Sequence, residues 1–430
     1  MILDTLRVLG SNLAVNLSSF LVLALAGRIM SIEEFAKLSL IVAGSQLLSS
    51  ALDLGTNVGT VKKYAESKEG RFLAALVWIK VAVACCCCGG LVIGYKLGVP
   101  PAWLIVLACA ASIDLWSGAR ALDQARMDFS GLAQANIAFA ALRCVLGIAG
   151  LATGSAFMVA MAFFIGPLLA VAAYKWRTTA ALTDRFDADT AREVLHYAWP
   201  VYVSAILFTL ALYYPQFVIA RQLDASAVAT FGVLLIFLGP LGLINASVRI
   251  YLLPRFAGKE VKRADVLANP RAMAMIVGVL VAALIGVAIG ALLIEQIYGA
   301  RYPGIGLPFW VFISLWLLTL YLGVFNLDVH RLGRVDAEAW VNAARLATLI
   351  IALWLFGRDL LSIVIVSAFI MFAGECVLFM VIGHLARRER ASASTPWNGH
   401  SRRSSNGTSF CRIPSMERAY SRKKQWCTII

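Results

Sequence analysis

Six charged side chains lie inside long apolar stretches of the chain, a setting in which charges usually serve a purpose. Three are acids and three are bases: Asp53, Lys80, Asp114, Arg143, Arg345 and Glu375. Because a charge inside the hydrocarbon of a membrane is costly, such residues face a water-filled cavity, pair with one another or mark a transport path. Arg143 lies about 16 Å into its stretch, so its guanidinium cannot reach an interface. We therefore expect Arg143 to need a carboxylate, a hydrated cavity or an anionic ligand.

The other internal charges have simpler interpretations that the residues alone leave open. Lys80 and Arg345 lie about two helical turns from an interface, so their long side chains could extend to it. The acids could form internal salt bridges, for example Asp114 with Lys80 or Arg143. Such pairing is compatible with transport, since a substrate or a proton can compete for the same charge.

Uncharged polar residues recur at helical spacing in several of these stretches. Ser45, Ser49, Asp53 and Asn57 follow one another every four residues, which predicts one polar stripe along a single helix. Further polar residues lie in the first and seventh stretches: Asn12, Asn16, Ser19, Tyr202, Tyr213, Tyr214 and Gln216. Any one of these groups could simply hold two helices together. A stripe that includes a carboxylate favours the lining of a cavity.

The elements that carry these residues must cross a membrane. The chain is 60% hydrophobic and 14% charged, with a mean hydropathy of +0.80, whereas soluble domains hold about 45–50% apolar and about 25% charged residues. This composition excludes a soluble enzyme, a secreted disulfide scaffold and a disordered chain. About twelve stretches are long enough to span a bilayer as helices: 8–27, 38–60, 72–95, 102–119, 132–152, 155–174, 199–220, 228–252, 273–295, 305–325, 337–356 and 361–383. The sequence therefore predicts an all-α polytopic membrane protein.

The second half of the chain repeats features of the first at an offset of about 192 residues. The segment Lys63–Glu69 resembles Arg255–Glu260, and a small residue followed by arginine occurs at both Gly27-Arg28 and Ala220-Arg221. Because transporters are often built from such repeats, we expect two pseudo-symmetric six-helix bundles. The predicted organisation is an N-terminal bundle at 1–174, a cytoplasmic linker at 175–198, a C-terminal bundle at 199–384 and a basic tail at 385–430.

The net charge of +14 is distributed as in a membrane protein rather than in a nucleic-acid-binding one. With the N-terminus inside, the cytoplasmic loops would hold eighteen Lys and Arg residues, against six in the opposite loops. Basic loops stay on the cytoplasmic side, so we expect both termini in the cytoplasm. The tail 385–430 adds ten basic residues against two Glu. Its composition predicts a disordered segment that could bind anionic lipid headgroups or be dispensable.

Motifs of enzymes, metal sites and ATP-driven pumps are missing from the sequence. It contains neither a Gly-rich phosphate-binding loop with Lys and Ser/Thr nor an HExxH motif, and no soluble segment long enough to hold a catalytic core. The cysteine run Cys85–Cys88 lacks the spacing of metal ligands. We expect no enzyme activity, no cofactor, no bound metal and no nucleic-acid partner.

An ordered set of short motifs resembles the polysaccharide-exporting flippases of the multidrug/oligosaccharidyl-lipid/polysaccharide superfamily. The motifs are Gly27–Phe35, Leu52–Gly55 and Lys62–Ala65 in the first half, and Ala227–Gly232, Leu253–Ala257 and Ile297–Tyr302 in the second. They cover about residues 5–385. One departure is Ala36, where the family usually has glycine. Since members of the superfamily have two six-helix bundles, the resemblance implies the same fold here.

The resemblance also implies a cargo and a site. The cargo would be a polyprenyl-pyrophosphate-linked oligosaccharide, moved across the bacterial inner membrane by alternating access for surface polysaccharide biosynthesis. Its anionic headgroup would require cations in one cavity between the bundles: Arg143, Lys80, Arg345, Arg28 and Arg249. Acids that could couple transport to an ion or proton gradient, and polar residues that could line the cavity, complete the predicted site: Asp53, Asp114, Glu375, Asn12, Asn16, Ser45, Ser49 and Asn57. Membrane lipids, a polysaccharide polymerase and glycosyltransferases are the expected partners.

Two other functions remain open from the residues alone. A cation-coupled multidrug antiporter of the same superfamily would need cavity carboxylates without opposing arginines, whereas this chain has at least as many internal bases as acids. A non-transporting membrane scaffold for a glycan-assembly complex is the third possibility.

Overall fold

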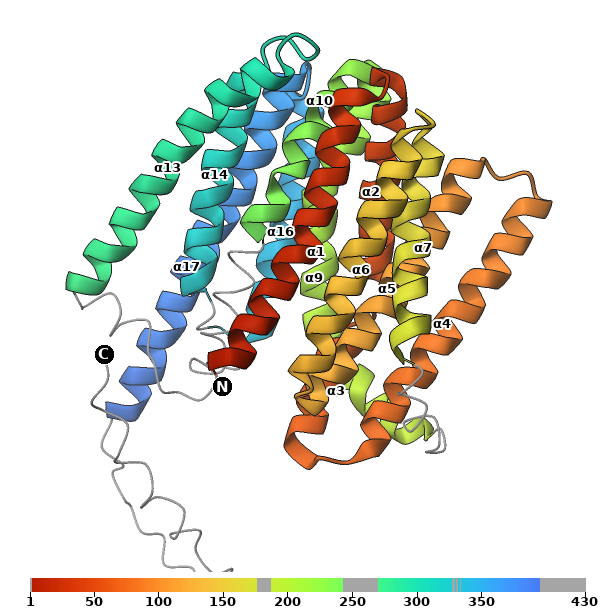
Figure 1. The fold of residues 1–430 in the computed structure, drawn as a ribbon. Coiled ribbons are helices and arrows are strands. Elements are labelled where there is room, and N and C mark those ends of the chain that lie inside the picture. Colours follow the sequence, from red (N-terminus) through yellow and green to blue (C-terminus); the bar gives the residue numbers. More distant parts are fainter. Residues whose placement is uncertain are drawn as a thin grey trace, which may run out of the picture. The chain divides into compact units, whose positions relative to one another are not determined.

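The described part of the chain is helical throughout (Figure 1). The computed structural model describes residues 2–175, 187–242, 270–326, 329, 332 and 334–394. Their helices are α1 (Ile2–Ile29), α2 (Ile32–Leu52), α3 (Thr56–Ser67), α4 (Gly70–Lys96), α5 (Pro101–Arg126), α6 (Phe129–Leu151), α7 (Ala156–Lys175), α9 (Ala188–Gln222), α10 (Ala225–Ile236), α13 (Pro270–Tyr298), α14 (Gly306–Phe325), α16 (Val335–Phe356) and α17 (Leu360–Ser394). The described residues up to 386 belong to one compact unit, and residues 387–394 lie outside it.

Eleven helices in the described ranges are long and apolar enough to cross a membrane. The apolar part of α7, Ala156–Ala172, is shorter, and with it each of the twelve predicted stretches has a helical counterpart. Four leucines spaced four residues apart on α1, from Leu13 to Leu25, are 39–49% exposed, as expected for a face that contacts lipid. The prediction of an all-α polytopic membrane protein is confirmed.

The second predicted stretch, 38–60, is not one helix. Helix α2 ends at Leu52, and α3 begins at Thr56, because Leu54 (φ 52°) and Gly55 (φ 69°) adopt the left-handed conformation. The carbonyl of Asp53 accepts hydrogen bonds from the Thr56 amide and hydroxyl, at 2.9 and 2.7 Å, which fixes the break. The single polar stripe predicted from Ser45 to Asn57 was therefore wrong, since Asn57 belongs to a different helix.

The seventh predicted stretch begins earlier than its apolar pattern indicated. Helix α9 is continuous from Ala188 to Gln222 and contains Pro200 and Pro215. The Asp187 side chain accepts hydrogen bonds from the Asp189 and Thr190 amides, and hydrogen bonding to Thr190 lowers the pKa of that carboxyl. Because this polar cap lies outside the apolar run, hydropathy assigned residues 188–198 to the predicted linker.

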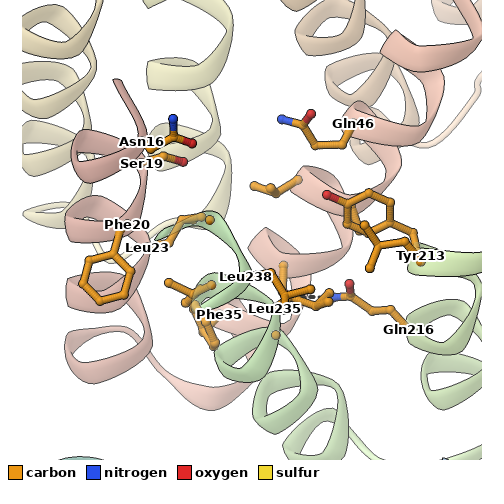
Figure 2. Close-up of a pocket in the computed structure, with 17 residues that line it drawn as sticks. Asn16, Ser19, Phe20, Leu23, Phe35, Gln46, Tyr213, Gln216, Leu235 and Leu238 are labelled. Carbon is orange, nitrogen blue, oxygen red and sulfur yellow. Dashed lines mark hydrogen bonds between the residues drawn. The ribbon is translucent and has the colours of Figure 1, made fainter. Parts of the chain in front are cut away.

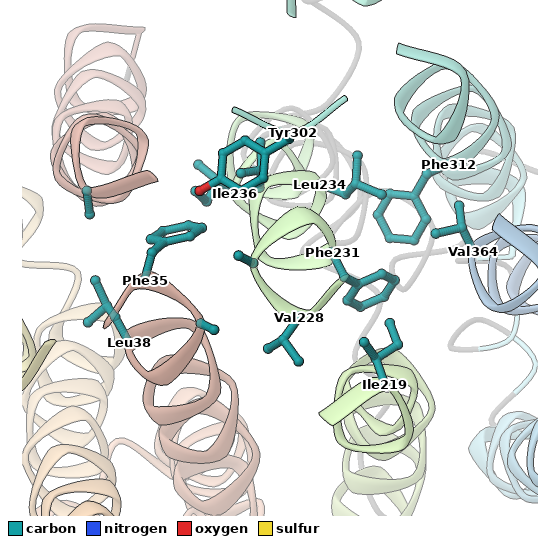
Figure 3. Close-up of a cluster of buried hydrophobic side chains, with 14 of the residues drawn as sticks. Phe35, Leu38, Ile219, Val228, Phe231, Leu234, Ile236, Tyr302, Phe312 and Val364 are labelled. Atoms are coloured by element: carbon teal, nitrogen blue, oxygen red, sulfur yellow. The ribbon is translucent and has the colours of Figure 1, made fainter. Parts of the chain in front are cut away.

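Helices α1–α7, here the N-terminal half, pack mainly on one another, as do α9 with α16 and α13 with α14 in the C-terminal half (α9–α17). The halves meet where α2 and α3 contact α9, and where α1 and α2 contact α10. The largest buried apolar cluster joins both halves through large side chains that include Phe35, Phe231, Tyr302 and Phe312 (Figure 3). The boundaries of the two six-helix bundles stay a prediction.

Gly55 lies where the start of α3 packs closely on α9. A Cβ on Gly55 would lie 3.0 Å from the Ala198 carbonyl oxygen, whereas one on Gly98, which has a similar φ of 72°, would meet no atom within 4 Å. We expect Gly98→Ala to lower the free energy of unfolding by about 1 kcal/mol, through backbone strain alone. Gly55→Ala should cost about 1 kcal/mol more, because α9 must also shift. Thermal unfolding of the two variants in detergent measures this difference, and equal losses would contradict the close packing of α3 on α9.

Candidate functional site

A pocket of about 300 Å³ lies between the two halves of the chain (Figure 2). Its walls come from α1 and α2 on one side and from α9 and the α10 region on the other. The polar lining residues are Asn16, Ser19, Ser39, Gln46, Tyr213 and Gln216, and the others are apolar or glycine. The described lining thus holds amides, hydroxyls and aromatic rings but no Lys, Arg, Asp or Glu. It can offer hydrogen bonds and apolar contact to a neutral polar molecule.

Helix α1 contributes to this pocket as its sequence indicated, but α2 uses a different face. Asn16 and Ser19 line the pocket from α1, and Ser39 and Gln46 line it from α2. The predicted lining residues of α2 and α3 instead serve packing within the N-terminal half. Ser45 donates to the Ile41 carbonyl at 2.6 Å, Ser49 is buried, and Asn57 donates to Ser117 Oγ at 3.0 Å.

Three of the predicted charges form one cluster at the break between α2 and α3. Lys80 Nζ on α4 lies 2.8 Å from Asp53 Oδ1 and 2.5 Å from Asp114 Oδ1 on α5. The lysine is only 4% exposed, so its side chain does not extend to an interface. The salt bridge considered for Asp114 and Lys80 is confirmed. With two carboxylates and one ammonium the cluster has an excess of one acidic group, and Asp114 Oδ2 has no hydrogen-bond partner.

The C-terminal half has its own buried ion pair. Arg345 Nη2 on α16 donates to Glu375 Oε1 on α17 at 2.9 Å, and Asn326 donates to the other carboxylate oxygen, Oε2, at 2.5 Å. The Arg345 guanidinium also lies 5.4 Å from the centre of the Phe208 ring on α9. A Cβ on Gly374 would overlap Arg345 Nε, so only glycine leaves room for this guanidinium. Arg345 is 3% exposed, so it too stays away from the interface.

Arg143 is buried without a carboxylate among the described residues. Its guanidinium lies 4.1 Å from the centre of the Phe139 ring and 5.0 Å from that of Phe163. Its Nη1 donates to the Val15 carbonyl of α1 at 3.3 Å, and its Nε has no partner. Two aromatic faces and one carbonyl compensate the charge only in part. Arg143 therefore keeps the capacity to bind an anion if its neighbours move.

Arg120 is a half-buried cation that the sequence interpretation missed. Its Nη2 donates to Asn12 Oδ1 at 2.8 Å, and Asn136 donates to the same oxygen at 3.1 Å. Arg120 Nε is buried without a partner. The apolar stretch ended at residue 119, which placed Arg120 in a predicted loop, whereas α5 continues to Arg126. The helical spacing of Trp116, Arg120 and Asp123 along one face was the signal that could have revealed it.

The cations that were predicted to share one cavity lie in separate places. Lys80 and Arg345 are each paired within their own half of the chain, and Arg143 lies between rings. Arg28 is exposed at the end of α1, and Arg249 lies outside the described residues. The physical reason is that Lys80 and Arg345 each have a carboxylate on an adjacent helix, and separating such a buried pair would leave an uncompensated charge. In the described ranges, no group of three or more His, Cys, Asp or Glu side chains could hold a metal ion.

Solved structures of membrane transporters match this architecture, although no protein-family model and no curated protein matches the sequence. Lipid II flippase MurJ in an inward closed conformation has a TM-score of 0.68 and 14% identity, over 89% of this chain and 88% of that chain. An inward-facing multidrug resistance MATE family transporter of the MOP superfamily has a TM-score of 0.60 and 13% identity, over 87% and 96%. An outward-facing MATE family transporter has a TM-score of 0.57 and 14% identity, over 91% and 96%.

The chain has the fold of these transporters. MurJ and the MATE proteins belong to the superfamily that the sequence motifs resemble, so the fold that the motifs implied is confirmed. Both a lipid flippase and multidrug transporters share this fold. At 14% identity or less the likeness establishes the architecture, and the choice of cargo depends on the chemistry of the pocket.

Removing the ammonium from the cluster at the α2–α3 break should destabilise this fold strongly. Lys80→Met leaves the buried carboxylate of Asp114 and the half-buried carboxylate of Asp53 without their shared ammonium, and we expect a loss of about 3–5 kcal/mol in unfolding free energy. Adding Asp114→Asn should recover part of that loss, because one buried charge is removed. Thermal unfolding in detergent measures both effects. The matched control is Lys37→Met, which removes an exposed pair with Glu34 and should leave stability unchanged. A Lys80→Met protein as stable as this control would contradict the cluster.

Proposed function

We propose that the chain is a flippase for polyprenyl-pyrophosphate-linked oligosaccharide, working by alternating access in bacterial surface polysaccharide biosynthesis. It would act in the inner membrane with both termini in the cytoplasm, without enzyme activity or a cofactor. A polysaccharide polymerase and glycosyltransferases would be its functional partners. The fold shared with MurJ and the MATE transporters supports transport between two halves.

The observation that carries this proposal is the neutral polar lining of the pocket between the halves. Sugars are bound by amides, hydroxyls and aromatic rings, which are the polar groups that the described lining presents (Figure 2). An organic cation would instead require an accessible carboxylate in the pocket. Asp53 and Asp114 pair with Lys80 in the N-terminal half, and Glu375 pairs with Arg345 in the C-terminal half. The multidrug antiporter is therefore the weaker candidate, although the MATE neighbours share its fold.

The headgroup would bind toward the polar face of α1. Asn16, which lines the pocket, donates to the Asn12 backbone carbonyl at 2.9 Å, and the Asn12 side chain accepts from Arg120. Val15, the backbone partner of Arg143, is adjacent to Asn16 in sequence. Both arginines retain buried N–H groups without partners. We assign the pyrophosphate to Arg120 and Arg143, and the sugar to the pocket residues beside them.

Deletion of the gene should cause lipid-linked oligosaccharide to accumulate in the inner leaflet. Complementing the deletion strain with variants should restore export to different extents. We expect Gln46→Leu to reduce export at least about tenfold, because the pocket loses an amide that sugar hydroxyls can bind. Arg143→Ala should abolish export, because the buried anion site loses its cation. Quantifying the lipid-linked intermediate in complemented deletion strains measures both.

The control for Gln46→Leu is Gln222→Leu, which removes an exposed amide at the end of α9 and should export normally. Normal export by Gln46→Leu and Arg143→Ala together would favour the non-transporting scaffold. Dye efflux without any accumulation of lipid-linked oligosaccharide in the deletion strain would favour the multidrug antiporter.

The internal acids provide the proposed coupling to an ion or proton gradient. The cluster of Lys80 with Asp53 and Asp114 has one more carboxylate than ammonium, so it could take up one proton or cation. It also adjoins the α2–α3 break that packs on α9. We expect Asp53→Asn or Asp114→Asn to make export independent of the gradient, with Glu375→Gln as the corresponding test in the C-terminal half. Export in vesicles with and without an imposed gradient measures this. Export that stays gradient-dependent in all three variants would remove the coupling role.

A further inference from the structure

Three donors, from the end of α13 and the turn that follows it, bind carbonyls in the last two turns of α1. Tyr298 Oη donates to the Ala24 carbonyl at 2.8 Å, and Tyr302 Oη donates to the Gly27 carbonyl at 3.0 Å. Arg301 Nη1 donates to the Arg28 carbonyl at 2.5 Å. The Gly27 and Arg28 carbonyls lie in the last turn of α1, where carbonyls have no partner within the helix and carry the negative end of its dipole. The Ala24 carbonyl lies one turn earlier and accepts from Tyr298 in addition to its helical hydrogen bond. The C-terminal half thus caps a helix of the N-terminal half.

This connection is held in shape by Glu295 on α13. The Glu295 carboxylate accepts from the Gly306 amide at 2.6 Å and from the Gly304 amide at 3.3 Å. Gly304 has a φ of 75°, so the turn depends on a residue that tolerates the left-handed conformation. The two tyrosines are therefore presented by a fixed turn. Burial raises the pKa of Tyr302 to about 12, so its hydroxyl remains a donor at physiological pH.

Further contacts between the two halves lie in the wall of the pocket. Gln216 Nε2 on α9 donates to Ser39 Oγ on α2, at 2.5 Å, and both residues line the pocket. A Cβ on Gly232 would overlap Ser39 Oγ, so α10 approaches α2 as closely as glycine allows. Phe35 is 1% exposed and joins the pocket wall to the large apolar cluster that also holds Tyr302 (Figure 3).

We propose that residues 298–302 are the gate that closes the pocket at the α1–α2 end of the molecule. The inference rests on the proposed transport function and adds to it a specific device: opening requires that the three α1 carbonyls exchange their protein donors for water. The closed state is favoured because Tyr302 and Arg301 satisfy helix-terminal acceptors and Tyr298 adds a further hydrogen bond to α1. The open state is attainable because the same carbonyls can accept from water once the turn moves away. In the predicted orientation this gate faces the outside of the cell.

The test measures access to the pocket and needs no known cargo. Ser19→Cys places a thiol in the pocket lining, and a membrane-impermeant maleimide is applied to intact cells or to inverted vesicles. The labelled peptide is quantified by mass spectrometry, so the native cysteines are retained. We expect Tyr298→Phe with Tyr302→Phe to raise the labelling rate from one membrane face by about tenfold, since each lost hydrogen bond contributes a factor of about two to ten.

The matched control is Tyr202→Phe. Its hydroxyl also joins the two halves, by donating to the Ala51 carbonyl at 3.2 Å, but it does so at the opposite end of α2. This control should leave the rate unchanged at the face that the tyrosine pair exposes. Glu295→Ala provides a second route to the same result, because it frees the turn without touching α1. If the Tyr298→Phe/Tyr302→Phe protein fails to fold, Glu295→Ala still tests the gate.

An unchanged labelling rate in both the Tyr298→Phe/Tyr302→Phe and Glu295→Ala proteins would overturn the gate, as would equal increases from both faces. The outcome is independent of the cargo. Suppose that the gate variants are labelled faster but the deletion strain accumulates no lipid-linked oligosaccharide. This result would refute the proposed glycan cargo and support the gate. Unchanged labelling in a protein that still exports glycan would refute the gate alone.

Discussion

The constraint on which the described structure depends is that a charge placed in the hydrocarbon must be compensated nearby. Lys80 and Arg345 meet it with carboxylates on adjacent helices, at 2.5–2.9 Å. Arg143 meets it only with the faces of two phenylalanines and one carbonyl. Because removing one partner of a buried ion pair leaves an uncompensated charge, these contacts favour α5 beside α4 and α17 beside α16. The compensated charges connect neighbouring helices, whereas Arg120 and Arg143 each keep a buried Nε without a hydrogen-bond partner.

This division explains why the pocket between the halves is neutral. Each half satisfies its strongest charges internally, so the surfaces that face each other can carry amides, hydroxyls and apolar side chains. Such surfaces can separate and meet again without exposing an unpaired ion. Close approach of the two halves depends on glycines: Gly232 beside Ser39, and Gly55 and Gly59 against α9.

The contacts between the halves are of two chemical kinds at their two ends. At the α1–α2 end, tyrosines and an arginine cap helix carbonyls above an apolar cluster. At the α3 end, an exposed salt bridge joins Lys63 to Glu193 at 2.7 Å, and hydrogen bonding to Glu193 raises the pKa of Lys63. An exposed ion pair contributes little and is screened by salt, whereas buried caps and apolar contacts persist. The two ends of the interface between the halves are therefore held together by different chemistry.

The sequence by itself determined the class of this protein and the position of its helices along the chain. An apolar stretch of about 20 residues forms a helix in lipid, because a helix satisfies all its backbone hydrogen-bonding groups internally. The internal charges also stood out for the same reason, as did the polar residues Asn16, Ser19, Tyr213 and Gln216, which line the pocket.

Only the tertiary structure decided how these residues combine. Whether Lys80 serves a cargo or two carboxylates depends on which helices lie beside α4, and no local pattern contains that information. The break at Leu54 and Gly55 was hidden because Asp53 and Asn57 keep a helical spacing across it. Arg120 was placed in a loop because hydropathy ends where the helix continues. The periodicity of a sequence indicates whether a side chain faces lipid or protein. Its contact partner depends on which helices, distant in sequence, pack beside it.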